Sequence, residues 1–273
     1  MRPGPFGLDP ILLILSRLGD PHETFGALHV AGTRGKGSTC ALLDSALQAA
    51  GIRAGLTTSP HLLEPCERIR IAGENVHPDR LLSLVSRVRT ASEGLDPGYF
   101  EVVTAAAFLA FAEDAVEVAV VEVGLGGRLD ATNVVRPLVT AITRLGLDHA
   151  DRLGTTRAAI AREKAGILKP GVAAVLAPNE SEAVDAVLAR AQELGVRVRC
   201  LTNDDVRRAP ATSLPGIVQA ENAAVAAAML EEPFVEQPVV RWEVHRLFFS
   251  LKMSSVEQLK TRANDRASGR LGT

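Results

Sequence analysis

The stretch HVAGTRGKGSTCALLDSAL, residues 29–47, places glycines, one lysine and two hydroxyls where an apolar strand turns into a helix. The glycines let backbone N–H groups approach a polyphosphate closely, and the helix dipole favours the negative charge. The lysine adds a positive charge, and a hydroxyl can bind a magnesium ion that bridges phosphates. The spacing departs from GxxxxGK[ST], so a tight turn with a solvated lysine stays the alternative. The residues concerned are Gly32, Gly35, Lys36, Gly37, Ser38 and Thr39.

A carboxylate ends a second apolar run, in the stretch VEVAVVEVGLGGRLDATNVV that begins at Val116. Burying a carboxylate at the end of a strand costs free energy unless the carboxylate meets a cation or hydrogen-bond donors. Two partners fit Glu122 equally well from spacing: a magnesium ion, or Arg128 in a structural ion pair. Asp130 and Asn133 follow in the same stretch and add further polar groups.

Three shorter stretches add polar residues after predicted strands or near a helix end. Ser59 and His61 lie in TTSPHLLEP, His149 lies in LGLDHADRLG, and Lys164 lies in IAREKAGILKPG. Ligands of open parallel sheets bind outside the carboxyl ends of the strands, so these residues are site candidates. Each also has an ordinary structural interpretation: a Ser-Pro-His turn, a structural histidine, and a lysine that opposes a helix dipole.

The composition excludes several classes of function. The 273 residues are 47% hydrophobic and 23% charged, with a mean hydropathy of +0.13, which is typical of a globular chain with a large core. A net charge of −2 predicts small-molecule partners rather than nucleic acid or an acidic membrane. The three cysteines are far apart and favour reduced thiols. The apolar run Ile11–Leu15 is too short to span a bilayer, and no cleavage site follows it, so we expect a cytoplasmic protein.

Valine- and alanine-rich runs alternate with segments of helical period, which is typical of a doubly wound, mostly parallel α/β sheet. We expect one such domain over residues 1–232 and a divergent tail over residues 233–273, which contains the only tryptophan, Trp242. Strands are predicted at Ala27–Ala31, Arg53–Thr58, Val116–Val123, Val139–Arg144, Val172–Ala177 and Arg197–Leu201. Helices are predicted at Lys36–Ala50, Glu101–Ala112, Thr155–Ala165 and Ser181–Leu194, the last followed by Gly195 as a C-cap.

Together these motifs resemble the folylpolyglutamate synthase/dihydrofolate synthase family of the Mur ligase superfamily. The matching stretches include HVAGTRGKGSTCALL, SPHLLEPCERIRIAGE, VVEVGLGGRLDATNVV, LGLDHADRLGTT and IAREKAGILKPG, in the order of the family, and the resemblance covers residues 6–232. It implies an ATP-dependent ligase in which a folate carboxylate attacks the γ-phosphate of ATP. The amine of glutamate then displaces phosphate from the acyl phosphate. Because two anions must meet, such a site needs magnesium, a lysine and backbone donors.

The resemblance also implies a role for each motif residue, with two magnesium ions and with Lys164 carbamylated. The implied ATP contacts are Thr33, Gly35, Lys36, Gly37, Ser38, Arg68 and Asn222. The implied metal ligands are Ser38, Ser59, Glu122, His149 and Lys164. The implied substrate contacts are Phe100, Asp130 and Ala131, and the implied catalytic residues are Lys36, His149 and Lys164.

Three features depart from the family pattern. Arg34 stands where asparagine is common, and Val218 stands where a histidine usually precedes the glutamine of an HQxxN motif. Residues 231–273 contain neither the arginine motif nor the aspartate motif with which the family's next domain completes the nucleotide site. We therefore expect the ATP-binding central domain, with a truncated or altered end, and a monomer.

Three other functions stay open on the sequence. The chain could be a binding protein that holds ATP or folate without completing the transfer. A Mur-type ligase for another acid, such as a cell-wall precursor, is disfavoured by SPHL and GLGGRLDATN, which accompany pterin-binding loops in the family that the chain resembles. A generic P-loop NTPase is disfavoured by the loop spacing, and it leaves Lys164 without a role.

Overall fold

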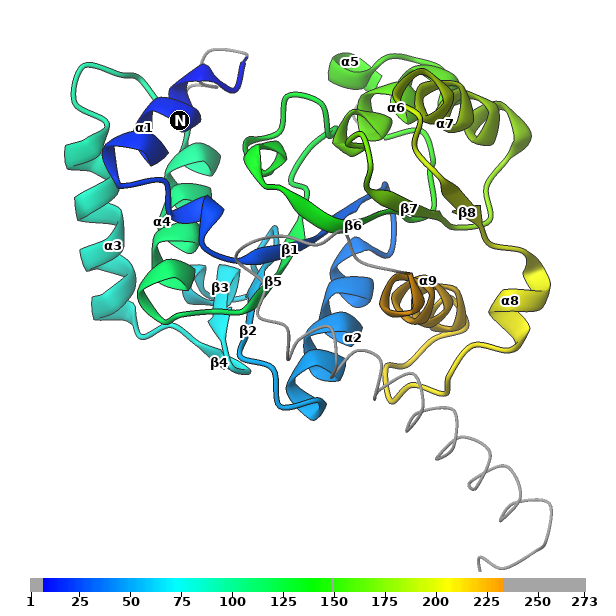
Figure 1. The fold of residues 1–273 in the computed structure, drawn as a ribbon, viewed down its shortest axis with the longest axis horizontal. Helices are drawn as coiled ribbons and strands as arrows, with labels where there is room; N and C mark the ends of the chain where they lie inside the picture. The colour runs from blue at the N-terminus through cyan, green and yellow to red at the C-terminus, as the bar shows by residue number, and fades with distance from the viewer. Residues whose placement is uncertain (1–6, 149, 233–273) are drawn as a thin grey trace, which may run out of the picture.

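The computed structural model describes residues 7–148 and 150–232. Its strands form one sheet in the order β4-β3-β2-β5-β1-β6-β7-β8 (Figure 1). The six neighbouring strands β2, β5, β1, β6, β7 and β8 run parallel. At one edge of the sheet, β3 pairs antiparallel with β2, and β4 pairs antiparallel with β3. The strands are β1 (Gly26–Ala31), β2 (Ala54–Thr57), β3 (Ile69–Ile71), β4 (Glu74–Asn75), β5 (Val118–Glu122), β6 (Pro137–Ile142), β7 (Ala173–Leu176) and β8 (Val198–Cys200).

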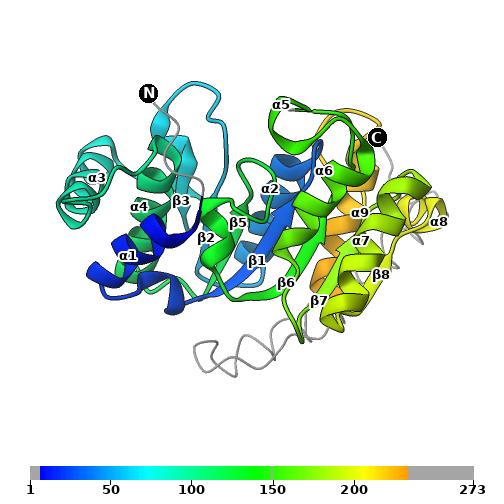
Figure 2. The ribbon, with the colours of Figure 1, turned by 90° about the horizontal axis from the view of Figure 1, so that it is seen from above.

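Helices cover both faces of the sheet, as expected for a parallel sheet. One face packs against α2 and α9, which contact each other, and the other packs against α1, α3 and α4 at one end and α6 and α7 at the other (Figures 1 and 2). The helices are α1 (Asp9–Arg17), α2 (Lys36–Ala49), α3 (Pro78–Ala91), α4 (Tyr99–Glu113), α5 (Ala150–Leu153), α6 (Arg157–Lys164), α7 (Ser181–Leu194), α8 (Asn203–Arg207) and α9 (Gln219–Glu231). Short 3₁₀ turns are η1 (Pro21–Glu23), η2 (Pro65–Arg68), η3 (Ala131–Val134) and η4 (Ala165–Ile167).

The predicted doubly wound sheet is confirmed. Each of the six predicted strands and four predicted helices is present, with ends within two residues of the prediction. The antiparallel pair β3 and β4 was not predicted, because strands of three and two residues are too short to show a period. Helices α1, α3, α5, α8 and α9 were also missing from the prediction, and α9 is alanine-rich on nearly every side. The predicted tail, residues 233–273, lies outside the described residues.

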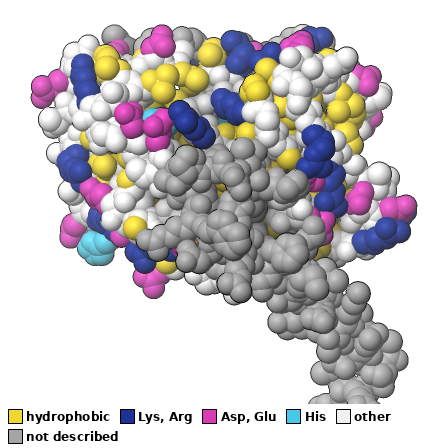
Figure 3. All heavy atoms as spheres, viewed as in Figure 1, with side chains coloured by type: hydrophobic (Ala, Val, Ile, Leu, Met, Phe, Trp, Pro, Cys, Tyr) yellow, Lys and Arg dark blue, Asp and Glu magenta, His cyan; other side chains and the backbone are white. Residues whose placement is uncertain are grey.

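Two surface features bear on possible partners. No helix among residues 7–148 and 150–232 is both long and apolar enough to cross a membrane. On the face seen in Figure 3, lysine and arginine side chains are interspersed with aspartate and glutamate side chains. Among the described residues visible in this view, the basic side chains therefore form no continuous patch.

Candidate functional site

The loop between β1 and α2 requires glycine at two positions. Gly32 has φ +152°, and a Cβ atom there would lie 1.8 Å from Thr143 Oγ1. Gly35, immediately before α2, has φ +86°, and a Cβ atom there would lie 2.1 Å from Asn222 Oδ1. No side chain caps the start of α2. The first N–H groups of this helix are therefore available to an anion.

The segment that follows β6 holds this loop. The Thr143 hydroxyl donates to Arg34 O at 2.8 Å. The backbone N–H groups of Thr33 and Arg34 both donate to Arg144 O, at 2.9 and 3.1 Å. The loop conformation is thus set by protein groups.

The start of α9 packs against the same loop. Arg144 Nε donates to Glu221 Oε1 at 3.0 Å, which ties the segment after β6 to α9. The next residue, Asn222, is buried beside Gly35, and its Nδ2 donates to Gln219 Oε1 at 2.8 Å. Asn222, predicted from its motif alone, therefore lies next to the glycine loop.

Glu122 faces the loop from the end of β5. It is 5% exposed, its Oε2 accepts the Ser59 N–H at 3.0 Å, and its Oε1 lies 4.0 Å from Lys36 Nζ. Burial raises its pKa, and the Ser59 N–H and the Lys36 charge oppose that rise. The alternative that Glu122 pairs with Arg128 is wrong, because Arg128 Nη2 binds Glu163 Oε1 at 3.0 Å. The structure gives Glu122 the Lys36 ammonium and the Ser59 N–H as partners, and magnesium at Glu122 stays a prediction.

Lys164, at the end of α6, points into the same region. It is 5% exposed, and its Nζ donates to Gly32 O at 2.9 Å. Burial, followed by the nearby charge of Lys36, lowers the pKa of Lys164 to about 8. It is therefore not a solvated lysine that merely opposes a helix dipole.

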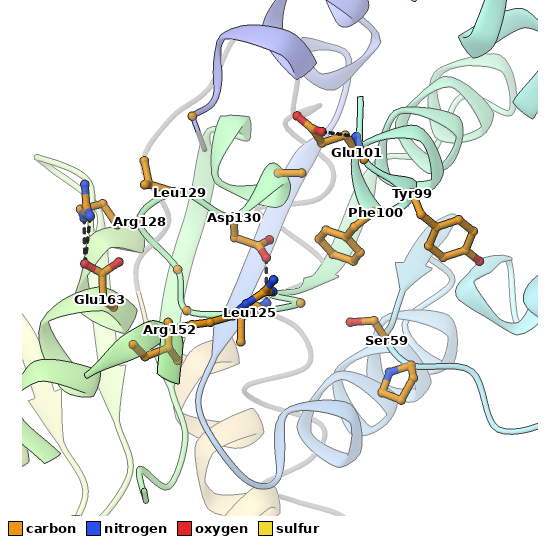
Figure 4. Close-up of a pocket in the computed structure, with 18 of the residues that line it drawn as sticks. Ser59, Tyr99, Phe100, Glu101, Leu125, Arg128, Leu129, Asp130, Arg152 and Glu163 are labelled. Atoms are coloured by element: carbon orange, nitrogen blue, oxygen red, sulfur yellow. Dashed lines mark hydrogen bonds and ion pairs between the residues drawn. The ribbon is translucent and has the colours of Figure 1, made fainter. Parts of the chain in front are cut away.

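A cavity of about 700 Å³ lies beside Ser59 and the turn that follows β5. Tyr99 and Phe100, from the start of α4, form one wall, and the Arg128–Glu163 ion pair lies on the other side of Asp130 (Figure 4). The lining residues that the sequence had singled out are Ser59, Arg68, Phe100, Arg128, Asp130 and Ala131. The cavity thus brings together the three predicted substrate contacts.

Arg68 is held inside this cavity by two neighbours. It is 8% exposed, its Nε donates to His61 Nδ1 at 2.9 Å, and its guanidinium carbon lies 5.4 Å from the centre of the Tyr99 ring. His61 is therefore a hydrogen-bond partner of Arg68. Tyr99, which the sequence analysis missed, has no motif spacing by which it could have been found.

Asp130 joins the turn after β5 to η3. Its Oδ2 accepts the Leu125 N–H at 2.8 Å (Figure 4). Its Oδ1 accepts the Thr132 N–H at 3.0 Å. Burial raises the pKa of Asp130, and these hydrogen bonds oppose the rise. The carboxylate therefore fixes the local backbone while it lines the cavity.

Comparison with known families decides the membership of the chain. Residues 30–211, which contain the loop, Glu122, Lys164 and most of the cavity, match the Mur ligase middle domain. The chain belongs to the Mur ligase middle-domain family.

Relatives of this Mur ligase domain share a narrower description. The chain is 44% identical over 188 residues to the dihydrofolate synthase/folylpolyglutamate synthase of Bacillus subtilis, a match that covers 66% of this chain and 44% of the relative. It resembles E. coli FolC, solved in complex with DHPP and ADP, with TM-score 0.75 and 32% identity over 86% of this chain and 60% of that one. A bifunctional folylpolyglutamate synthase/dihydrofolate synthase solved with Mn, AMPPNP and L-glutamate gives TM-score 0.74 and 34% identity, over 85% and 60% of the two chains. The chain therefore spans less than two thirds of these relatives.

The predicted site of this Mur ligase domain is only partly gathered in the structure. Among the described residues, no three His, Cys, Asp or Glu side chains form a group that could hold a metal ion. The predicted ligand set instead combines two hydroxyls, one carboxylate, Lys164 and His149. His149 lies outside the described residues. The sequence analysis also missed Thr143 and Arg144, which hold the loop through contacts that no local spacing reveals.

Proposed function

We propose that this chain binds ATP at the loop of residues 32–38 and supports ligation of L-glutamate to a folate. The reaction would be polyglutamylation of tetrahydrofolate, conversion of dihydropteroate to dihydrofolate, or both. The observation that carries the proposal is the position of Glu122, which faces Lys36 with one oxygen and accepts the N–H of cavity residue Ser59 with the other. A phosphate on the loop and an acid in the cavity would thus meet at one carboxylate.

The chemistry requires two anions to approach each other. Attack of a folate carboxylate oxygen on the γ-phosphorus of ATP forms an O–P bond, expels ADP and gives an acyl phosphate. The glutamate amine then attacks the acyl carbon, loses a proton and expels phosphate. Lys36 and the first N–H groups of α2 would stabilise charge on the phosphates, with Thr33, Gly35, Gly37 and Ser38 in the same loop.

A divalent ion fits the residues around Glu122. This buried carboxylate has its pKa raised by desolvation although the Ser59 N–H and the charges of Lys36 and Arg68 oppose that rise, so a cation would relieve the remaining cost of its burial. We assign the magnesium shell to Ser38, Ser59, Glu122, His149 and Lys164. When bound, magnesium would neutralise phosphate charge during transfer.

Lys164 suits carbamylation. Uptake of CO2 needs a neutral amine, and a buried lysine with a pKa of about 8 is neutral far more often than a solvated lysine. The carbamate would add two oxygens beside Gly32, where a second magnesium would bind.

The remaining predicted contacts divide between the two ligands. We place the adenine side of ATP near Asn222, beside Gly35, and the pterin of the folate against Phe100, Asp130 and Ala131 in the cavity. Arg68, predicted as an ATP contact, lines the cavity and lies close enough to Glu122 to affect its pKa. We therefore place Arg68 beside the phosphate that is transferred. The monomeric state and the cytoplasmic location stay predictions.

The test is incorporation of labelled glutamate. The purified chain would be incubated with MgATP, bicarbonate and either dihydropteroate or tetrahydrofolate. We expect labelled folate with the native protein and not with Lys36→Met or Lys164→Ala. Arg190→Met, an exposed arginine on α7 that pairs with Glu193, is the control for loss of a positive charge.

Two other outcomes would each replace this proposal with an alternative. Binding of both ATP and dihydropteroate without any labelled product would make the chain a binding protein that does not complete the transfer. Labelled product with another carboxylic acid, and not with a folate, would make it a ligase of different specificity.

A further inference from the structure

A fully buried histidine is linked to Asp130 through one hydroxyl group. His29, in β1, has 0% of its surface exposed, and its Nε2 lies 2.9 Å from Thr132 Oγ1. Thr132 Oγ1 in turn donates to Asp130 Oδ1. Asp130 lines the cavity, whereas His29 and Thr132 do not. The three side chains form a hydrogen-bonded chain from the middle of the sheet to the cavity wall.

The direction of the hydrogen bonds in this chain follows from Asp130. Its two oxygens accept the backbone N–H groups of Thr132 and Leu125, so the carboxylate acts as an acceptor on both sides. The single hydroxyl hydrogen of Thr132 therefore goes to Asp130, and Thr132 Oγ1 must accept from His29 Nε2–H. His29 Nδ1, which is buried and has no hydrogen-bond partner among the described residues, then carries no proton.

The surroundings keep His29 neutral. Desolvation lowers its pKa to about 3, and the positive charge of Lys169 contributes in the same direction. The Lys169 Nζ donates to Asn133 O at 3.0 Å, which fixes the charge on this side of η3. Near neutral pH, His29 therefore stays unprotonated at Nδ1, and the hydrogen bonds from His29 through Thr132 to Asp130 keep their direction.

We infer that His29 and Thr132 are positioning residues that hold the Asp130 carboxylate as a fixed acceptor at the cavity wall. Thr132 donates twice to Oδ1 and Leu125 donates once to Oδ2, so Oδ2 is the oxygen with more capacity left to accept from a ligand. Such a carboxylate selects ligands with N–H donors, such as an amino-substituted heterocycle, over ligands with acceptors only. The inference rests on the proposed function, in which a pterin occupies this cavity.

The tautomer can be tested without a ligand. In the full chain labelled with ¹⁵N in its histidine rings, the signals of His29 are identified by their loss in His29→Gln. We expect the neutral Nε2–H form at about pH 6, where a solvated histidine is largely protonated. An Nδ1–H tautomer, or an imidazolium at that pH, would overturn the inference.

Positioning can be tested by calorimetric titration of dihydropteroate into the full chain with magnesium and a non-hydrolysable ATP analogue. Thr132→Val keeps the shape of the side chain and removes the hydroxyl, and we expect about tenfold weaker dihydropteroate binding with unchanged affinity for the analogue. Thr132→Ser restores the hydroxyl, and we expect affinity within about twofold of the native value.

Thr140→Val is the matched control. Thr140 pairs with His29 across β1 and β6 and is equally buried, but its hydroxyl donates to Ala173 O. We expect this variant to bind dihydropteroate as the native protein does. Melting temperatures of all variants would verify that each one folds.

The outcomes separate this inference from the proposed function. Equal dihydropteroate affinity of the native protein and Thr132→Val would overturn the positioning role and leave the proposed function standing. Failure of the native protein to bind either dihydropteroate or tetrahydrofolate, titrated in the same way, would overturn the proposed function and, with it, the selection of N–H donors. In either case, the tautomer measurement tests the hydrogen bonds that connect His29 through Thr132 to Asp130.

Discussion

Burial of His29 predicts that the stability of the fold falls as the solution is made acidic. The folded pKa is about 3, whereas the ordinary value is 6.5, so the unfolded chain binds more protons between these values. The contribution of His29 is fully present above pH 6.5 and is lost as the pH falls toward 3. At about pH 5, which is about 1.5 units below the unfolded pKa, the loss amounts to about 2 kcal/mol in the free energy of unfolding.

The comparison of the native protein with His29→Gln isolates this contribution. Urea unfolding followed by circular dichroism at about pH 7.5 and about pH 5 gives the free energy of unfolding of each protein. Because the other titrating groups are common to both, the difference between native and variant should shrink by about 2 kcal/mol between the two conditions. A difference that stays constant within about 0.5 kcal/mol would refute the desolvated, neutral histidine.

Three further predictions test other parts of the site. Lys164→Met removes the cost of desolvating a charge but also one hydrogen bond to Gly32 O. The net effect at about pH 7 should be a rise of about 1–2 kcal/mol in the free energy of unfolding of the metal-free protein. Urea titrations should show this gain fading as the pH rises from about 8, the folded pKa of Lys164, toward 10.5, its ordinary pKa, because at the upper pH the lysine is neutral in both the folded and the unfolded chain. Gly35→Ala places a Cβ atom 2.1 Å from Asn222 Oδ1 at a positive φ, so calorimetry should show at least about tenfold weaker binding of an ATP analogue. Gly124→Ala places a Cβ atom 2.5 Å from the Phe100 ring, so the same titrations should show weaker binding of dihydropteroate and unchanged binding of the analogue; equal effects on both ligands would contradict a separate folate cavity.

The predicted parallel strands agree with the structure because their signal is local. A buried parallel strand must be apolar along its whole length, and β1, β5 and β6 are each buried at every position. The C-terminal end of α7 agrees with the prediction because Gly195, expected as the C-cap, adopts φ +65° directly after the helix. The hairpin of β3 and β4 carries no such signal, since its strands are short and partly exposed.

The candidate site was predictable only as a set of positions. Spacing identified Lys36, Glu122 and Lys164 one by one, because each follows or ends a recognisable element. Spacing could not decide whether Glu122 pairs with Arg128, since that choice depends on Glu163, which lies 35 residues further along the chain. It also could not find the contact between Tyr99 and Arg68, which depends on how α4 packs beside η2.

By itself, the sequence determined the glycine loop, the succession of strands and helices along the chain, and the polar residues at strand ends. These features depend on backbone conformation and on hydrophobic periodicity, which neighbouring residues control. Only the tertiary structure decided the partners of those residues: Asn222 beside Gly35, Ser59 on Glu122, and His29 joined through Thr132 to Asp130. These contacts join segments that the sheet order brings together, and His29 loses its charge because the packed interior removes water from it.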